Sequence, residues 1–330
     1  MVLITGIAVI DVIGSGFARV AEPGELVYGS VRYSLGGHAC NVSVDLAQLG
    51  FPKSQLRAVF PAGRDIFGGY LVDTLKKRGV VSEPVLLPGI PTSLDLILVA
   101  KGQDRRFHVD PGANVAMPAD AVMALIKKYR PRLFYAGGTG LMKAMDARLD
   151  DVLKLARSLG ALTFVDIVSP YRQTWAFLRR ALPQIDIFHC NTDEAAEITG
   201  VSQPRPALDK LRGLGPKFVF LTSGAQGGLA GLPGATLHLP AFSITAKDPT
   251  GAGDAFSAAL ILKIYRSLRR GIGPADIPVK DWKAILLYAS ACGAVCCTGL
   301  GATTSVTEEK VESLVRRQGR AFSRAVMTLG

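Results

Sequence analysis

The stretch D-P-T-G-A-G-D-A-F, residues 248–256, places three small residues between two aspartates. It runs into A-F-S-A-A-L-I-L-K-I-Y and then R-S-L-R-R-G, which predicts a buried helix with basic residues and a glycine at its end. Gly251, Ala252 and Gly253 therefore precede a helix whose first amides lack partners, and this arrangement can bind an anion. Asp254, in the same turn, is a candidate general base. The spacing alone equally allows a turn with a first-turn acid and no catalytic role.

The bulk composition indicates one large α/β domain. The chain has 330 residues, 48% of them hydrophobic and 20% charged, with a formal net charge of +11. The basic residues are densest at 266–270 and 316–324, near the ends of predicted helices, so we interpret them as solvated helix ends and expect no nucleic-acid partner. The five cysteines include no C-x-x-C pair, which favours a reduced cytoplasmic protein.

Two apolar segments are interpreted as core elements. Residues 1–14 have no basic leader region and Asp11 interrupts them, so they predict a first core strand and no signal peptide. The run 284–300 is shorter than the about 20 apolar residues of a membrane span and is rich in Ala, Cys and Gly. We expect it to form a buried helix, and we expect no membrane partner.

Apolar runs alternate with helix-compatible segments along the chain. Such continuous runs are typical of parallel strands that are buried on both faces. The predicted strands are 56–63, 132–138, 162–168, 185–191 and 217–224, after the opening run. This alternation predicts a three-layer α/β domain with helices on both faces of a mostly parallel sheet.

Two other segments follow a different pattern. Residues 12–35 and 93–110 alternate apolar and polar side chains, which is typical of antiparallel strands with one open face. We expect them to form a small lid sheet within a single domain of residues 1–330. A partly open apolar sheet is typical of a lid or an interface, because such a face would otherwise favour aggregation.

The motifs together resemble the PfkB/ribokinase family of carbohydrate and nucleoside kinases. D-P-T-G-A-G-D-A-F resembles the C-terminal signature of that family. The other matching pieces, in chain order, are L-G-G-H-A-C-N (35–41), A-G-R-D-I-F-G (62–68), D-P-G-A-N (110–114), N-T-D-E (191–194) and T-S-G-A-Q-G (222–227). The resemblance implies a ribokinase-like αβα sandwich with a small antiparallel β lid. It also implies ATP-dependent transfer of the γ-phosphoryl group to a sugar hydroxyl. By analogy with ribokinase-like members, the exposed face of the lid sheet implies a homodimer formed through the lid.

The resemblance assigns roles to these residues. Asp254 becomes the catalytic base, and the amides of Gly251, Ala252 and Gly253 hold the charge of the transferred group. The expected acceptor-binding residues are Asp11, Gly36, Gly37 and Asn41. The expected nucleotide-loop residues are Thr222, Gly224 and Gly227. The alternative for Asp11, from the residues alone, is a turn residue before Gly14.

Two metal sites are implied in the same way. Asn191 and Glu194 offer hard oxygens to Mg²⁺, directly or through water, although the same pair is a helix-capping pattern. The positions at which some members of the family bind K⁺ are Asp248, Thr250 and Ser305.

Other functions stay open at this point. A nucleoside acceptor would stack on lid aromatics, for which Phe17, Tyr28, Tyr33 and Phe107 are candidates. A non-catalytic sugar-binding regulator on the same fold is a second alternative. A dinucleotide-dependent dehydrogenase is a third, because G-S-G-F-A-R (14–19) begins like a phosphate-binding turn.

Overall fold

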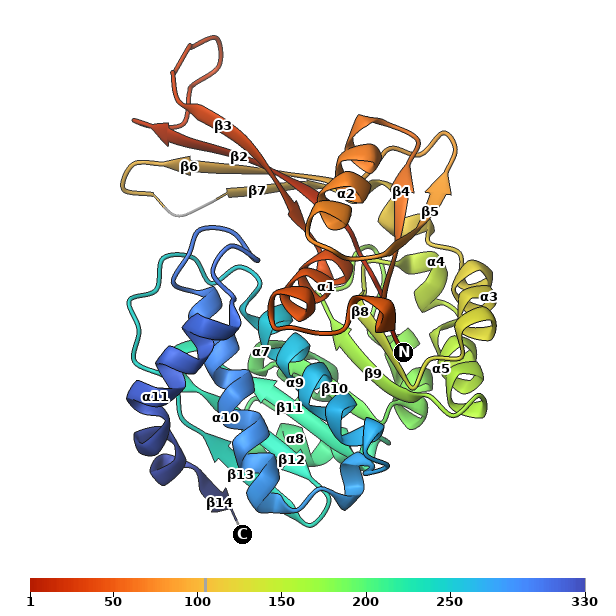
Figure 1. The fold of residues 1–330 in the computed structure, drawn as a ribbon. Coiled ribbons are helices and arrows are strands. Elements are labelled where there is room, and N and C mark those ends of the chain that lie inside the picture. Colours follow the sequence, from red (N-terminus) through yellow and green to blue (C-terminus); the bar gives the residue numbers. More distant parts are fainter. Residues whose placement is uncertain (104–105, 330) are drawn as a thin grey trace.

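A large, mostly parallel sheet forms the body of the protein (Figure 1). The computed structural model describes residues 1–103 and 106–329. Within these residues the sheet has ten strands, in the order β14-β13-β12-β11-β10-β9-β8-β1-β4-β5. Their bounds are β1 Val2–Gly6, β4 Leu56–Gly63, β5 Ser82–Leu87, β8 Leu133–Thr139, β9 Leu162–Ile167, β10 Ile187–Asn191, β11 Phe218–Thr222, β12 Gly228–Leu232, β13 Ala235–Leu239 and β14 Met327–Leu329. The strands from β5 to β11 are parallel, whereas β12, β13 and β14 are antiparallel.

Helices cover both faces of this sheet, and each face has its own core. One face packs on α1 His38–Gln48, α2 Ile66–Lys77, α9 Ala252–Arg269, α10 Val279–Cys296 and α11 Glu308–Ala325. The other packs on α3 Ala119–Tyr129, α4 Lys143–Asp146, α5 Leu149–Ser158, α6 Ala176–Ala181, α7 Thr192–Thr199 and α8 Pro204–Gly213. Strand β1 illustrates the alternation, because Val2 and Ile4 join the first core and Leu3 joins the second. The predicted three-layer sandwich is confirmed.

A second, smaller sheet projects from the body as the predicted lid (Figure 1). Its strands are β2 Val9–Phe17, β3 Ser30–Gly36, β6 Leu94–Ala100 and β7 Arg106–Asp110, in the order β3-β2-β6-β7. The outer pairs β2–β3 and β6–β7 are antiparallel hairpin partners, and the central pair β2–β6 is parallel. This central pairing brings together two segments that lie more than seventy residues apart in sequence.

The opening apolar run divides into two strands, so the prediction of one core strand was wrong. β1 belongs to the large sheet, whereas β2 starts the lid at Val9. The backbone of Gly6 approaches so closely that a Cβ there would lie 2.5 Å from the Gly137 carbonyl oxygen. The side chain of Asn114, from the P-G-A-N motif, then holds both backbone groups of Ala8 at 3.0 Å. Asp11 consequently lies within the lid sheet and not at the end of a central strand.

Other sequence predictions can be compared directly. The apolar run 284–300 contributes to α10, and no helix of the described residues is long and apolar enough to cross a membrane. The segment G-S-G-F-A-R lies on strand β2 and beyond it without a following helix, which removes the basis for a dinucleotide-binding turn. Strands β5, β12, β13 and β14 were not predicted.

Asp65 of the A-G-R-D-I-F-G motif ties the body to the lid. Its carboxylate caps α2 by accepting the Gly68 amide at 2.8 Å. It also accepts the amide and the hydroxyl of Thr92, both at 2.7 Å, just before β6.

Replacing Asp65 by alanine removes a helix cap and both contacts with Thr92. We expect the variant to lose about 2 kcal/mol or more of unfolding free energy, measured by urea denaturation. Asp73→Ala removes an exposed carboxylate from the same helix and is the matched control, expected to stay within about 0.5 kcal/mol of the parent. Equal stability of the two variants would contradict the role of Asp65.

Candidate active site

The N-terminus of α9 forms an amide-lined turn, as the sequence predicts. Gly251 is the N-cap at φ 81°, and a Cβ on it would lie 2.5 Å from the Ala302 side chain. The Ala252 amide donates to the Pro249 carbonyl at 3.1 Å, so it is already engaged within the turn. In the part of the chain that the structure describes, the amides of Gly251 and Gly253 have no hydrogen-bond partner. These two amides are therefore the donors that remain for an anion.

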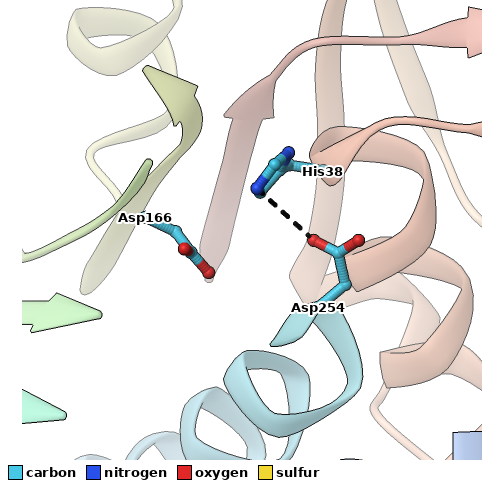
Figure 2. Close-up of side chains that lie close together, drawn as sticks. All are labelled: His38, Asp166 and Asp254. Atoms are coloured by element: carbon cyan, nitrogen blue, oxygen red, sulfur yellow. Dashed lines mark ion pairs between the residues drawn. The ribbon is translucent and has the colours of Figure 1, made fainter. Parts of the chain in front are cut away.

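Asp254 lies in the first turn of α9 and is 8% exposed. Its Oδ2 accepts a hydrogen bond from Asn41 Nδ2 on α1 at 2.8 Å. Its Oδ1 faces His38 Nε2 at 3.8 Å, as Figure 2 shows. The helix starts of α1 and α9, which are far apart in sequence, thus meet at the candidate base.

The charge state of Asp254 is set mainly by its burial. Burial raises the pKa of this carboxyl above its ordinary value, the charge of His38 acts against the rise, and the charge of Asp166 adds to it. A carboxyl with a raised pKa accepts a proton more readily than an exposed aspartate does. This property suits a general base.

The predicted acceptor-binding residues lie beside Asp254. Gly37 is the N-cap of α1 at φ 87°, where a Cβ would lie 2.5 Å from the Ile7 carbonyl oxygen. Gly36 lies under Asp11, because a Cβ on Gly36 would be 2.7 Å from both carboxylate oxygens. The structure therefore brings Asp11, both glycines and Asn41 to one place.

A cavity of about 690 Å³ opens on the other side of the amide-lined turn. It has the size of a typical small-ligand site. The predicted loop residues Thr222, Gly224 and Gly227 line it, and so do Ala252 and Gly253. Most of the remaining lining is apolar and was not predicted: Leu221, Leu239, Pro240, Ala241, Phe242, Ile244, Ala246, Pro249, Phe256, Ala294 and Cys297. Much of it comes from the loop after β13, whose sequence P-A-F-S-I-T-A has no periodicity that marks a site.

Asn191 and Glu194 form a complete capping box at the start of α7. Asn191 Oδ1 accepts the Glu194 amide at 2.8 Å, and Glu194 Oε2 accepts the Asn191 amide at 2.9 Å. Burial raises the pKa of Glu194, while the charges of His189 and His38 lower it and that of Asp166 raises it. Asn191 pairs with Thr222 in the register of β10 with β11, so the capping box lies beside the predicted nucleotide loop. The capping alternative is confirmed, and a carboxylate oxygen beside the site fits Mg²⁺ held through water.

The three residues proposed for a monovalent cation lie on two loops that meet. Asp248 accepts the amides of Thr250 and Gly301, each at 3.0 Å. Ser305 is 5% exposed, and its Oγ lies 1.9 Å from the position of a Cβ on Gly299. Carboxylate and hydroxyl oxygens of this kind are hard donors that suit such an ion.

A buried polar network beneath the site was missed by sequence reasoning. Asp166 Oδ2 accepts from Ser257 Oγ at 2.8 Å and Tyr135 Oη at 3.1 Å, and it pairs with His189 Nδ1 at 3.0 Å. The other imidazole nitrogen lies 3.3 Å from Thr222 Oγ1. Burial acts to raise the pKa of Asp166, but His189 brings it below the ordinary value. His189 stands in a strand between apolar residues, where nothing in the sequence distinguishes it.

His38, Asp166 and Asp254 also lie close enough together to hold a metal ion (Figure 2). Asp166 fits this role poorly. One of its oxygens already accepts the Ile167 amide, and the other serves the buried network.

Comparison with known proteins assigns the chain to a class of enzyme. Residues 1–309 match the model of the pfkB family carbohydrate kinases, so the chain belongs to that family and is a sugar kinase by class. It is 28% identical over 300 residues to probable fructokinase-5 of Arabidopsis thaliana, covering 86% of this chain and 89% of that protein. It is 27% identical over 289 residues to aminoimidazole riboside kinase of Salmonella typhimurium, covering 82% and 84%.

A solved structure confirms the fold. The ribokinase of Arabidopsis thaliana complexed with ribose and ATP superposes with a TM-score of 0.77 at 21% identity, covering 96% of this chain and 98% of that one. The ribokinase-like fold predicted from the motifs is therefore confirmed.

Gly251→Ala tests the amide-lined turn. A Cβ at this position meets Ala302 and strains a left-handed backbone, so the turn must shift. We expect kinase activity, followed as ADP release, to fall by roughly a hundredfold, because small displacements at a reacting centre have effects of that size. Gly271→Ala is the control, since it has a similar φ of 78° but open space around the Cβ. Equal activity of both variants would rule out the proposed anion site.

Proposed function

We propose that the protein is an ATP-dependent phosphotransferase that moves the γ-phosphoryl group to a hydroxymethyl or hydroxyl group of a small sugar. One observation carries the proposal: the buried carboxylate of Asp254 lies in the same helical turn as the open amides of Gly251 and Gly253. Phosphoryl transfer needs a charge-stabilising cradle and a positioned base at one place, and this turn provides both.

Each residue has a distinct task in the proposed reaction. Asp254 takes the proton from the acceptor hydroxyl while its oxygen attacks the γ-phosphorus, and the bond to the leaving nucleoside diphosphate breaks. The Gly251 and Gly253 amides donate to the equatorial oxygens. Asn41 donates from its amide nitrogen to Asp254 Oδ2 and so fixes the carboxylate. Asp254 Oδ1, on the side of His38, is left to take the proton of the acceptor hydroxyl. Mg²⁺, when held near Asn191 and Glu194, would neutralise charge on the phosphate oxygens.

The donor side is supported by the cavity described above. Its apolar lining suits a nucleobase, and Thr222, Gly224 and Gly227 suit the phosphates. The Arabidopsis ribokinase named above is a complex with ATP, which favours ATP as the donor. A K⁺ ion on the loops of Asp248, Thr250 and Ser305 would stiffen the turn before α9.

A nucleoside acceptor remains the second candidate, since aminoimidazole riboside kinase is among the relatives. Among the lid aromatics, Tyr28 is 82% exposed and free of the body, whereas Tyr33 packs against Phe67 at 6.0 Å between ring centroids. A non-catalytic regulator is disfavoured because Asp254 and both open amides are retained.

The proposed assembly is a homodimer formed through the lid. Large apolar side chains are exposed on lid residues Leu26, Tyr28, Val31, Tyr33, Leu96, Phe107 and Val109. Their burial against a second copy would stabilise it. A reducing cytoplasmic setting completes the proposal and is supported by five cysteines that form no disulfide.

Asp254→Asn keeps the size of the side chain and removes its basicity. We expect ADP release to fall by about 10² or more while nucleotide binding, measured by calorimetry, is retained. Asp281→Asn makes the same change at an exposed position at the start of α10 and is expected to be fully active. Full turnover by Asp254→Asn would exclude this residue as the base.

The pH profile of kcat/KM reports the ionisation of the base. Activity requires ionised Asp254 and is lost as the pH falls through its pKa, which burial places above that of an ordinary aspartate. His38→Gln removes the charge that lowers this pKa, so the acid limb should move to higher pH. A limb that stays in place would show that His38 does not influence the base.

A further inference from the structure

The acceptor side of the site presents buried oxygen atoms that lack donors. Among the described residues, Asn41 Oδ1, Asp95 Oδ1 and Asp254 Oδ1 are buried and have no hydrogen-bond partner. Asn41 cannot present its NH₂ group there, because a carboxylate only accepts and Asp254 already takes that donor. Unpaired buried acceptors are costly, so a ligand is expected to supply the donors.

Asp11 and Asp95 form a carboxylate pair across the central strands of the lid. They are directly opposite in the parallel pairing of β2 with β6, so their side chains are on the same face of the lid sheet. Asp11 is 8% exposed and lies over Gly36, at the turn that leads to α1. Asp11 thereby lies at the turn from which α1 starts, and α1 carries Asn41, which holds Asp254. Sequence analysis predicted Asp11 and missed Asp95.

Neighbouring carboxyl groups oppose the ionisation of Asp11. Burial, Asp95 and Asp248 together raise the pKa of Asp11 to about 7. Burial also raises the pKa of Asp95, and His108 opposes this rise through its amide and its charge. His38 faces Asp254. Two adjacent carboxyl groups offer several acceptors, and a carboxyl that keeps its proton adds a donor, which matches neighbouring hydroxyl groups.

We propose that Asp95, paired with the expected acceptor-binding residue Asp11 across the lid strands, selects an uncharged polyol as the phosphate acceptor by binding a hydroxyl next to the one that Asp11 binds, and that the two carboxyl groups exclude anionic acceptors such as sugar acids. Asp95 is thereby a specificity-determining residue. This inference rests on the proposed kinase function and specifies the class of phosphate acceptor as uncharged polyols. Hydroxyl groups satisfy the unpaired oxygens, whereas an acidic group would be desolvated against Asp11, Asp95 and Asp254.

The test compares neutral sugars with acids of similar shape. ADP release from Mg-ATP is measured with D-ribose and D-fructose, and with D-ribonate and 2-keto-D-gluconate. We expect the parent enzyme to use a neutral sugar with at least roughly a hundredfold higher kcat/KM than the corresponding acid. Asp95→Asn is expected to raise KM for the neutral sugar about tenfold or more, with little change in kcat. The ratio of kcat/KM for the neutral sugar to kcat/KM for the acid should fall in this variant. Asp281→Asn, which removes a remote carboxylate, should do neither.

The outcomes separate this inference from the proposed function. A parent enzyme that prefers an acid, or an Asp95→Asn variant that matches Asp281→Asn in KM and discrimination, overturns the carboxylate-pair inference and leaves the kinase intact. If no sugar yields ADP, the kinase proposal fails for these acceptors, and calorimetric binding of the same four compounds decides the inference. Binding of a neutral sugar that Asp95→Asn weakens supports it, and absence of neutral-sugar binding overturns it.

Discussion

The hydrogen bond between Asn41 and Asp254 is the contact on which the site depends. It joins the first turns of α1 and α9, which are 213 residues apart in sequence. Both helices pack on the same face of the sheet, and glycines precede both. Because Asn41 can donate only from its amide nitrogen, the bond fixes the orientation of the side chain as well as the separation of the helices.

The electrostatic character of the site changes from one side of this contact to the other. On the donor side, helix amides and an apolar cavity suit a nucleotide that carries its charge on phosphates. On the proposed acceptor side, Asp11 lies over Gly36, Asp95 pairs with Asp11 across the lid strands, and Asp254 is held by Asn41. In the proposed reaction, the transferred group moves from helix amides that attract negative charge toward the carboxylate that acts as the base. Because Asp11 and Asp95 belong to the lid, the proposal links acceptor recognition to closure of the lid over the site.

The sequence predicted the features that short local patterns encode. Strand β4 was predicted with its observed bounds, and the glycines before α1 and α9 have the positive φ that their turns require. The large-scale arrangement also followed, because alternating buried strands and helices allow few architectures. The division of the opening run into β1 and β2 was not predictable, since both halves are apolar. It depends on contacts with Gly137 and Asn114, which are distant in sequence.

The missed site residues share a physical reason. Asp95 becomes a candidate site residue only because β6 pairs with β2 and places it opposite Asp11. No short-range sequence pattern predicts this pairing. His189 and Asp166 are buried in adjacent central strands, where a polar residue is visible only once its partners are known. Gly36, Asn41 and Asp254 were predicted because they belong to motifs, but the contacts between them come only from the fold.

A crystal structure with Mg²⁺ and a non-hydrolysable ATP analogue tests the central claim most directly. The account predicts the base of the analogue in the cavity lined by Phe242 and Ile244, with its terminal phosphate within hydrogen-bond distance of the Gly251 and Gly253 amides. The Asp254 carboxylate should then face the acceptor side, close to that phosphate. A terminal phosphate bound elsewhere, with these amides open, would contradict the account.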